Sequence, residues 1–134
     1  METLVNIDVP DLEPAIEFYE RATELTLGRR LFEGTVAELA AGSVRIFLSE
    51  KETGSAPVPG AELSRDYRRH WTPVHLDFVV PEIEMAVERA IAAGARLEGP
   101  VQNFVWGRQA SFSDPFGHGF CLLQWRGGGY DEVA

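Results

Sequence analysis

Two side chains with acid–base chemistry share a short alternating stretch. In the segment 74–80, apolar residues alternate with His75 and Asp77, which places both polar side chains on one face of an expected strand. An imidazole at such a place can donate or accept one hydrogen bond to a ligand. It can equally be a half-buried strand histidine satisfied by a neighbour, and the sequence leaves both interpretations of His75 open.

A tryptophan and an arginine flank Gly107. The Trp106 indole offers a large, stiff stacking surface, and the Arg108 guanidinium can fork onto a carboxylate or a phosphate. The alternatives are a tryptophan that covers a sheet edge and an arginine paired with one of the many acids. The pattern favours a ligand contact for Trp106 and an ion pair for Arg108, and we retain both as candidate ligand-binding residues.

The single cysteine and two further aromatic residues are also candidates. Cys121 lies in an apolar run, where a free thiol usually behaves as a small apolar side chain. Nothing beside it in the sequence indicates a thiolate. Trp71 and Tyr67 lie in a long polar segment and are expected to be exposed enough to cover a site.

The elements that must position these residues occur twice in the same order. Alternating and helical periodicities predict strand, helix and three strands over 3–9, 12–25, 29–33, 35–40 and 43–49, then again over 74–80, 83–94, 96–102, 108–112 and 119–125. The segment 9–17 also matches 80–88 without gaps, which indicates an internal repeat. The expected fold class is α+β, with two βαβββ modules forming a curved mixed sheet around a cleft and the helices outside.

The repeat divides the chain into one domain of four parts: module one (3–49), a linker (50–72), module two (73–126) and a tail (127–134). The net charge of −9 opposes binding to nucleic acid, which requires a basic surface. The apolar runs are too short for a membrane span, and residues 1–3 show no secretory pattern. With a single cysteine, these features predict a soluble, cytoplasmic protein with no nucleic-acid or membrane partner.

The paired modules, the segment VPDLEPAIEFYE (9–20) and the segment WGRQASFSDPFGHGFCLLQ (106–124) resemble the vicinal oxygen chelate superfamily. That superfamily includes glyoxalase I, extradiol dioxygenases and bleomycin-resistance proteins, and the resemblance covers all but the linker and tail. It implies metal ligands from the first and last strand of each module, at positions that hold Leu4, Phe47, His75 and Cys121 here. Leucine and phenylalanine offer no lone pair, and hard cations do not select a thiol, so we expect no metal of the family type and no other cofactor.

The leading hypothesis is a small-molecule-binding protein, closest in type to the metal-independent bleomycin-resistance proteins, that sequesters an aromatic or cationic, antibiotic-like ligand. The resemblance also implies a homodimer. We expect no catalytic residue, and the candidate ligand-binding residues are His75, Trp106, Arg108, Phe47, Trp71 and Cys121. One alternative is a lyase, isomerase or dioxygenase that holds a divalent metal with His75 and non-standard ligands such as Asp8, Glu38 or Asp77. Another is a regulatory domain with a vestigial cleft.

Overall fold

The computed structural model describes all 134 residues, and the chain forms two compact units, Met1–Arg68 and Arg69–Ala134. Each unit contains one helix and one sheet, so the expected α+β class with two βαβββ modules is confirmed. Neither helix is long and apolar enough to cross a membrane. The two units are described separately below.

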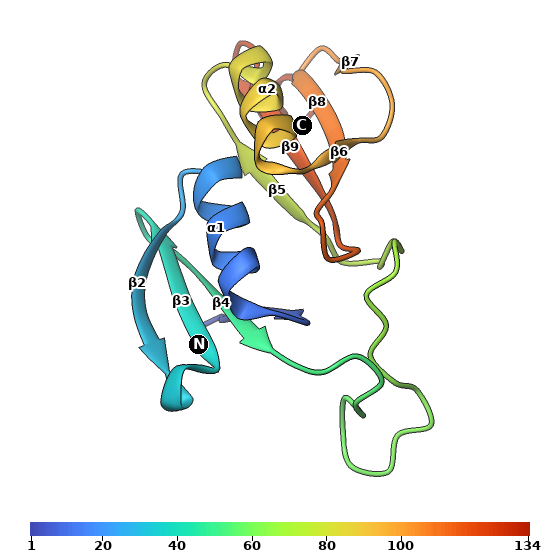
Figure 1. The fold of residues 1–134 in the computed structure, drawn as a ribbon. Coiled ribbons are helices and arrows are strands. Elements are labelled where there is room, and N and C mark those ends of the chain that lie inside the picture. Colours follow the sequence, from blue (N-terminus) through green and yellow to red (C-terminus); the bar gives the residue numbers. More distant parts are fainter. The chain divides into compact units, whose positions relative to one another are not determined.

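The first unit is a four-stranded sheet with one helix on one face (Figure 1). Its elements are β1 (Val5–Val9), α1 (Leu12–Ala22), β2 (Thr26–Leu31), the 3₁₀ turn η1 (Phe32–Gly34), β3 (Val36–Ala41) and β4 (Val44–Glu50). The strand order is β1-β4-β3-β2, with β1 parallel to β4 and the other pairs antiparallel. Alternate residues of β3 and β4, such as Leu39, Ile46 and Leu48, are fully buried on the side of α1.

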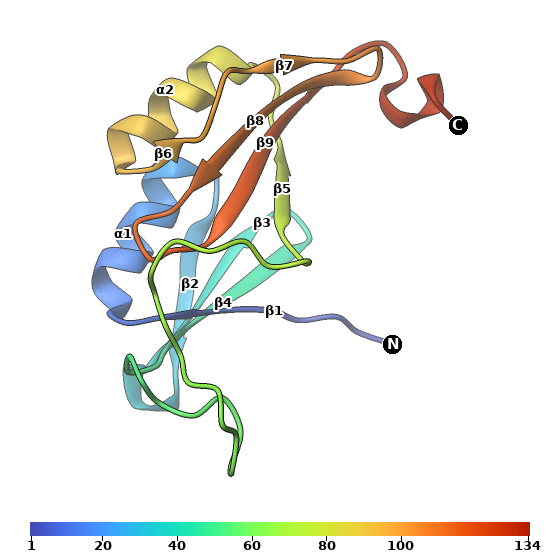
Figure 2. The ribbon, with the colours of Figure 1, turned by 90° about the vertical axis from the view of Figure 1, so that its right-hand side faces the viewer.

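The second unit repeats this arrangement, with α2 along one face of its sheet (Figure 2). Its elements are β5 (Leu76–Val79), α2 (Ile83–Ala93), β6 (Arg96–Leu97), β7 (Gln102–Asn103), β8 (Gly107–Ser113), β9 (Gly119–Trp125) and the 3₁₀ turn η2 (Gly129–Glu132). The strand order is β5-β9-β8-β6, and β7 also pairs with β8. The strand expected over 96–102 is therefore two short pieces, because the chain turns at Gly99, where φ is +107°, and Pro100 has no N–H to donate.

Each helix begins against a side chain from the last strand of its own unit. The Leu12 N–H donates to a carboxylate oxygen of Glu50 at 2.9 Å, and the Ile83 N–H donates to the side-chain oxygen of Gln124 at 2.8 Å. These acceptors satisfy N–H groups that a helix start leaves without an intrahelical partner. They fix each helix on one side of its sheet, and we call the other side the helix-free face.

Candidate functional site

The helix-free face of the second sheet brings together a histidine, an aspartate and the cysteine. Asp77 on β5 lies directly opposite Cys121 on β9 in the parallel ladder. His75 precedes β5, and its Nε2 lies 3.3 Å from Oδ1 of Asp77. The candidate ligand atoms of these three residues all lie within 4.8 Å of one another. His75 is exposed, as a ligand-binding group would be, and it also contacts a neighbouring acid, as a structural histidine would. It therefore has features of both interpretations that the sequence left open.

The Cys121 thiol is buried and forms hydrogen bonds with side chains of β8. The Gln109 amide donates to Sγ at 3.3 Å, and the Ser111 hydroxyl lies 3.6 Å from the same sulfur. Burial raises the pKa of Cys121, and the nearby Asp77 carboxylate acts in the same direction, whereas the hydrogen bonds with Ser111 and Gln109 oppose the shift. The group is therefore a neutral thiol at pH 7 and a weak nucleophile.

Trp71 lies beside this cluster and is held by contacts within the second unit. Its ring is edge-on to His75 at a centroid distance of 6.0 Å, and the Arg69 guanidinium lies 4.4 Å from the ring centroid. The ring packs so closely on Gly119 that a Cβ built there would lie 2.4 Å from it. Trp71 nevertheless keeps 48% of its surface exposed, so the indole is both positioned and accessible.

Arg69 is itself fixed by Glu98, which receives hydrogen bonds from two guanidinium nitrogens at 2.5 Å each. This bidentate pair lowers the pKa of Glu98 to about 2, against a smaller opposing effect of burial. A carboxylate so stabilised keeps Arg69, and through it Trp71, in place near neutral pH. Sequence reasoning did not identify the Arg69–Glu98 pair, because the two residues are far apart in the chain.

Trp106 and Arg108 do not join the His75 cluster. Trp106 stacks on Phe104 with ring centroids 4.8 Å apart, and its ring also meets Trp125 and Tyr130. Arg108 points to the helix side of the sheet, where it forms an ion pair with Glu84 of α2 and a hydrogen bond with Asn103. The structure therefore places Arg108 in the ion pair that the sequence favoured, and Trp106 in a separate aromatic cluster.

The helix-free face of the first sheet carries charge. Phe47 on β4 is half-buried and lies between Asn6 on β1 and Glu38 on β3. The Glu38 side chain is only 10% exposed, and the Nε of Arg29 donates to it at 2.6 Å. Leu4 precedes β1 and is exposed. The sequence identified Phe47 and named Glu38 as an alternative metal ligand, but it gave no signal for Arg29.

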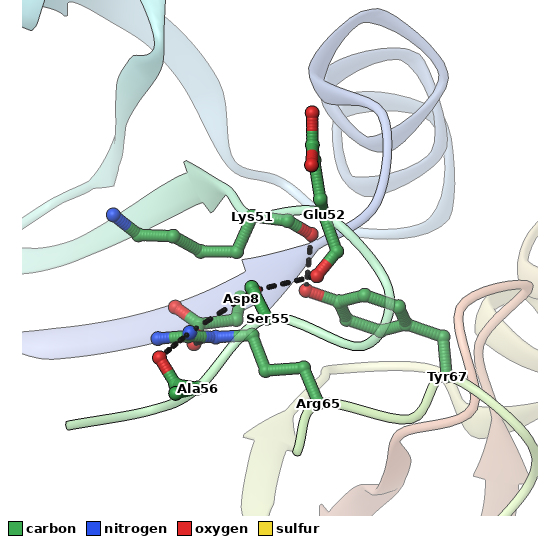
Figure 3. Close-up of polar contacts among 7 residues, drawn as sticks. All are labelled: Asp8, Lys51, Glu52, Ser55, Ala56, Arg65 and Tyr67. Carbon is green, nitrogen blue, oxygen red and sulfur yellow. Dashed lines mark hydrogen bonds and ion pairs between the residues drawn. The ribbon is translucent and has the colours of Figure 1, made fainter. Parts of the chain in front are cut away.

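The segment that follows β4 folds back onto its own unit, where its Arg65 pairs with Asp8, the second acidic residue of this face (Figure 3). Arg65 donates to Asp8 at 2.7 Å, to the Ser55 hydroxyl at 3.2 Å and to the Ala56 carbonyl at 2.7 Å. The Tyr67 hydroxyl donates to the Lys51 carbonyl at 2.8 Å (Figure 3), and burial raises the pKa of Tyr67. Asp8 and Glu38 are thus ion-paired with arginines, which opposes their use as metal ligands.

The donor set does not fit the metal site that this fold implies. Two of the four implied positions, Leu4 and Phe47, present carbon only, and a third presents the protonated thiol of Cys121. His75 alone matches the implied type. The arrangement provides instead an exposed indole next to a hydrogen-bonding pair, and a three-donor cluster of nitrogen, oxygen and sulfur within one sheet.

Two βαβββ units of this kind define the vicinal oxygen chelate superfamily, to which glyoxalase-related and antibiotic-resistance proteins with the same fold belong. The chain belongs to the family of the glyoxalase-like domain, whose sequence model matches residues 4–123. An uncharacterised protein of Mycobacterium bovis is 29% identical over 120 residues, which cover 87% of this chain and 78% of that protein. An uncharacterised protein of Mycobacterium tuberculosis H37Rv is equally similar, with 69% of its length covered.

Solved structures share the fold at low sequence identity. The fosfomycin resistance protein FosX of Listeria monocytogenes is 18% identical with a TM-score of 0.73, covering 100% of this chain and 98% of that one. TioX from Micromonospora is 19% identical with a TM-score of 0.69, covering 94% and 99%. A glyoxalase/bleomycin resistance protein/dioxygenase from Nocardioides is 22% identical with a TM-score of 0.63, covering 96% and 87%. At these identities the likeness establishes the fold and leaves the reaction to the site.

Proposed function

We propose that the protein binds a small aromatic ligand and sequesters it unchanged, without a metal ion of the family type. One observation carries this proposal: the exposed indole of Trp71 is held beside the His75–Asp77 pair on the helix-free face of the second sheet. An indole of this kind provides stacking area, while the imidazole and carboxylate fix the orientation of a ligand through hydrogen bonds. The Asp77 carboxylate also favours a cationic group on that ligand.

Trp71 and Trp106 provide a matched pair of variants for the test. We expect bleomycin, or trimethylphenylammonium as a minimal aromatic cation, to bind the wild type in isothermal titration calorimetry. Binding should weaken about tenfold in Trp71→Leu, in line with the loss of a stacking contact, and remain unchanged in Trp106→Leu. Mass spectrometry after incubation should recover the ligand unaltered. Binding that is lost in Trp106→Leu alone would move the site to the aromatic cluster, and a chemically altered ligand would refute sequestration.

A second function is favoured by the convergence of His75, Asp77 and Cys121. Nitrogen, oxygen and sulfur donors together suit Zn²⁺ or a similar borderline ion, and three protein ligands leave the open position that a catalytic site requires. A bound ion would act as a Lewis acid in a lyase, isomerase or dioxygenase of this superfamily. Before any ion binds, Cys121 must release its proton, which the burial of the thiol opposes.

Elemental analysis of the purified protein separates the two functions. Cells are grown with added zinc, nickel, iron and manganese, and the metal content of wild type, His75→Ala and Cys121→Ser is compared with that of His70→Ala as the control histidine. Near-stoichiometric metal that is lost in the first two variants and kept in His70→Ala would favour the enzyme. The expected result is no stoichiometric metal in any of the four proteins. The homodimer remains a prediction, which light scattering of the same samples tests.

A further inference from the structure

Two arginines surround one buried carboxylate on the helix-free face of the first sheet. Glu38 accepts a hydrogen bond from Nε of Arg29 at 2.6 Å, and Nε of Arg45 lies 3.9 Å from its other oxygen. The second distance is too long for a hydrogen bond, so Arg45 is attracted to Glu38 without donating to it. One carboxylate therefore stands against two guanidinium groups, and this cluster holds an excess of one positive charge.

That excess is unusual in a chain with a net charge of −9. The two guanidinium-bearing side chains are also accessible, with 63% of Arg29 and 58% of Arg45 exposed. Arg29 directs Nε to Glu38, which leaves its two terminal nitrogens for another acceptor. Such fixed N–H groups match the planar oxygens of a carboxylate or a phosphate.

An aromatic side chain lies in the same row of the sheet. Phe47 is directly opposite Glu38 in the β3–β4 ladder, and Glu38 is directly opposite Arg29 in the β2–β3 ladder. Neighbouring strands are about 4.8 Å apart, so the backbones of Phe47 and Arg29 are roughly 10 Å apart across the sheet. A benzene ring with an attached acid group spans that distance once the reach of the arginine side chain is included.

We infer that this cluster is a subsite for the oxyanion of a small aromatic acid, with its ring against Phe47 and its carboxylate or phosphate on Arg29 and Arg45. Glu38 acts as a positioning residue: it anchors the Arg29 guanidinium and limits the net charge of the subsite. The inference concerns residues of the first unit alone. It does not depend on the ligand site proposed at Trp71 and His75.

Two probes with the same ring and opposite charge test the inference. They are 4-trifluoromethylbenzoate and 4-trifluoromethylbenzylammonium, followed by ¹⁹F NMR titration against the full chain. We expect the benzoate to bind wild type and to bind about tenfold more weakly to Arg29→Met and to Arg45→Met, since each change removes a charged hydrogen-bond donor. Phenyl phosphate and inorganic phosphate, titrated in competition, report whether a phosphate replaces the carboxylate and whether the ring contributes.

Arg30→Met is the matched control. Arg30 is adjacent to Arg29 on β2, but it faces α1 and pairs with Glu13 at 2.6 Å. Its loss removes the same charge from the chain without touching the subsite, and benzoate binding should be unchanged. Equal weakening in Arg30→Met and Arg29→Met would mean that only the overall charge matters, which overturns the inference.

Glu38→Gln separates a binding role from a structural one. The change keeps the shape of the side chain and an oxygen that can accept from Nε of Arg29, and it removes the negative charge. We expect benzoate to bind about threefold to tenfold more tightly, a gain that a merely structural role would not produce. No benzoate binding to wild type, or tighter binding of the benzylammonium probe than of benzoate, refutes the anion subsite. Either result leaves the calorimetric test at Trp71 unaffected, so the two proposals fail separately.

Discussion

The helix-free faces of the two sheets share one hydrogen-bond register and differ in chemistry. In each unit the first of the four main strands is parallel to the last. The residues that pair across the strands of one sheet have counterparts that pair in the same way in the other sheet. The equivalent residues are Asn6 and Asp77, Phe47 and Cys121, Glu38 and Ser111, and Arg45 and Gly119. The first unit fills these positions with an aromatic ring and ion pairs, and the second fills them with a thiol, neutral hydrogen-bond donors and a His–Asp pair.

This comparison separates what the backbone determines from what the side chains determine. The backbone places four positions of the helix-free face next to one another in each unit, and this placement is a property of the fold. Whether those positions attract an anion, a cation or a metal depends on residues that the fold leaves free to vary. The first unit gathers arginines around Glu38, whereas the second keeps Asp77 beside a neutral thiol.

The largest expected effect tests whether the two units are energetically separate. Leu39 and Phe112 occupy equivalent buried positions on the helix sides, and Phe112 stacks on Phe120 at 5.4 Å. Truncation of such side chains leaves a cavity, so Phe112→Ala should cost about 4 kcal/mol of unfolding free energy and Leu39→Ala about 3 kcal/mol. Hydrogen exchange followed by mass spectrometry should show protection lost mainly in the unit that carries the substitution. Equal loss in both units would show that the chain unfolds as one cooperative body.

Sequence reasoning predicted the elements well, because each depends on local periodicity. The alternation around His75 and the helical spacing from Ile83 both appear within one element, and the repeat of 9–17 at 80–88 fixed their order. The contact of Asp77 with Cys121 depends on the pairing of β5 with β9, which no local pattern specifies. The helix-capping contacts of Glu50 and Gln124 with the starts of α1 and α2 were missed for the same reason.

The charged cluster of the first unit was missed for a different reason. Arginines on exposed strands resemble ordinary solvated residues, and nothing in the sequence around Arg29 or Arg45 shows that both lie near Glu38. Their proximity follows from the antiparallel pairing of three strands. Long-range pairing therefore decides which candidate residues meet, while local pattern decides only the face on which each one lies.

The next largest expected effect is the loss of stability at low pH that the Arg69–Glu98 ion pair of the second unit produces. The pKa of Glu98 is about 2 in the folded protein against an ordinary value of 4.5, so ionised Glu98 stabilises the fold fully above pH 4.5 and loses this effect as the pH falls toward 2. The free energy of unfolding, measured by urea denaturation, should fall by about 2 kcal/mol as the pH is lowered through this window. This amount is reduced because the pair is partly exposed to solvent.

Glu98→Gln should make that part of the pH profile flatter, and Glu17→Gln, which alters an exposed pair with Arg21 on α1, should leave it unchanged. A Glu98→Gln profile that still falls as steeply as that of wild type would assign the acid sensitivity to other carboxylates.

Gly119 tests the contrast between the faces more directly, because the equivalent position in the first unit is Arg45. A Cβ at Gly119 would lie 2.4 Å from Cζ3 of Trp71, so Gly119→Ala must displace the indole. Trp71 is half exposed and its ring can move, so we expect a modest cost of about 1 kcal/mol. Trp fluorescence should shift to longer wavelength as the indole meets more water, and affinity for trimethylphenylammonium should fall. Unchanged fluorescence and affinity would contradict the role of Trp71.

The last prediction compares thiol reactivity, with a cysteine placed at the same register position in both units. Cys121 should react slowly with 5,5′-dithiobis(2-nitrobenzoate) at pH 7.5, because burial raises the pKa of its thiol. Phe47→Cys in a Cys121→Ser background puts the thiol beside Glu38 and within the field of two arginines, on a half-buried site. That thiol should react at least about tenfold faster, since exposure and nearby positive charge both favour the thiolate. Equal rates would mean that the backbone position sets the chemistry of these faces, and faster reaction at Cys121 would reverse the assignment of the more electropositive face to the first unit.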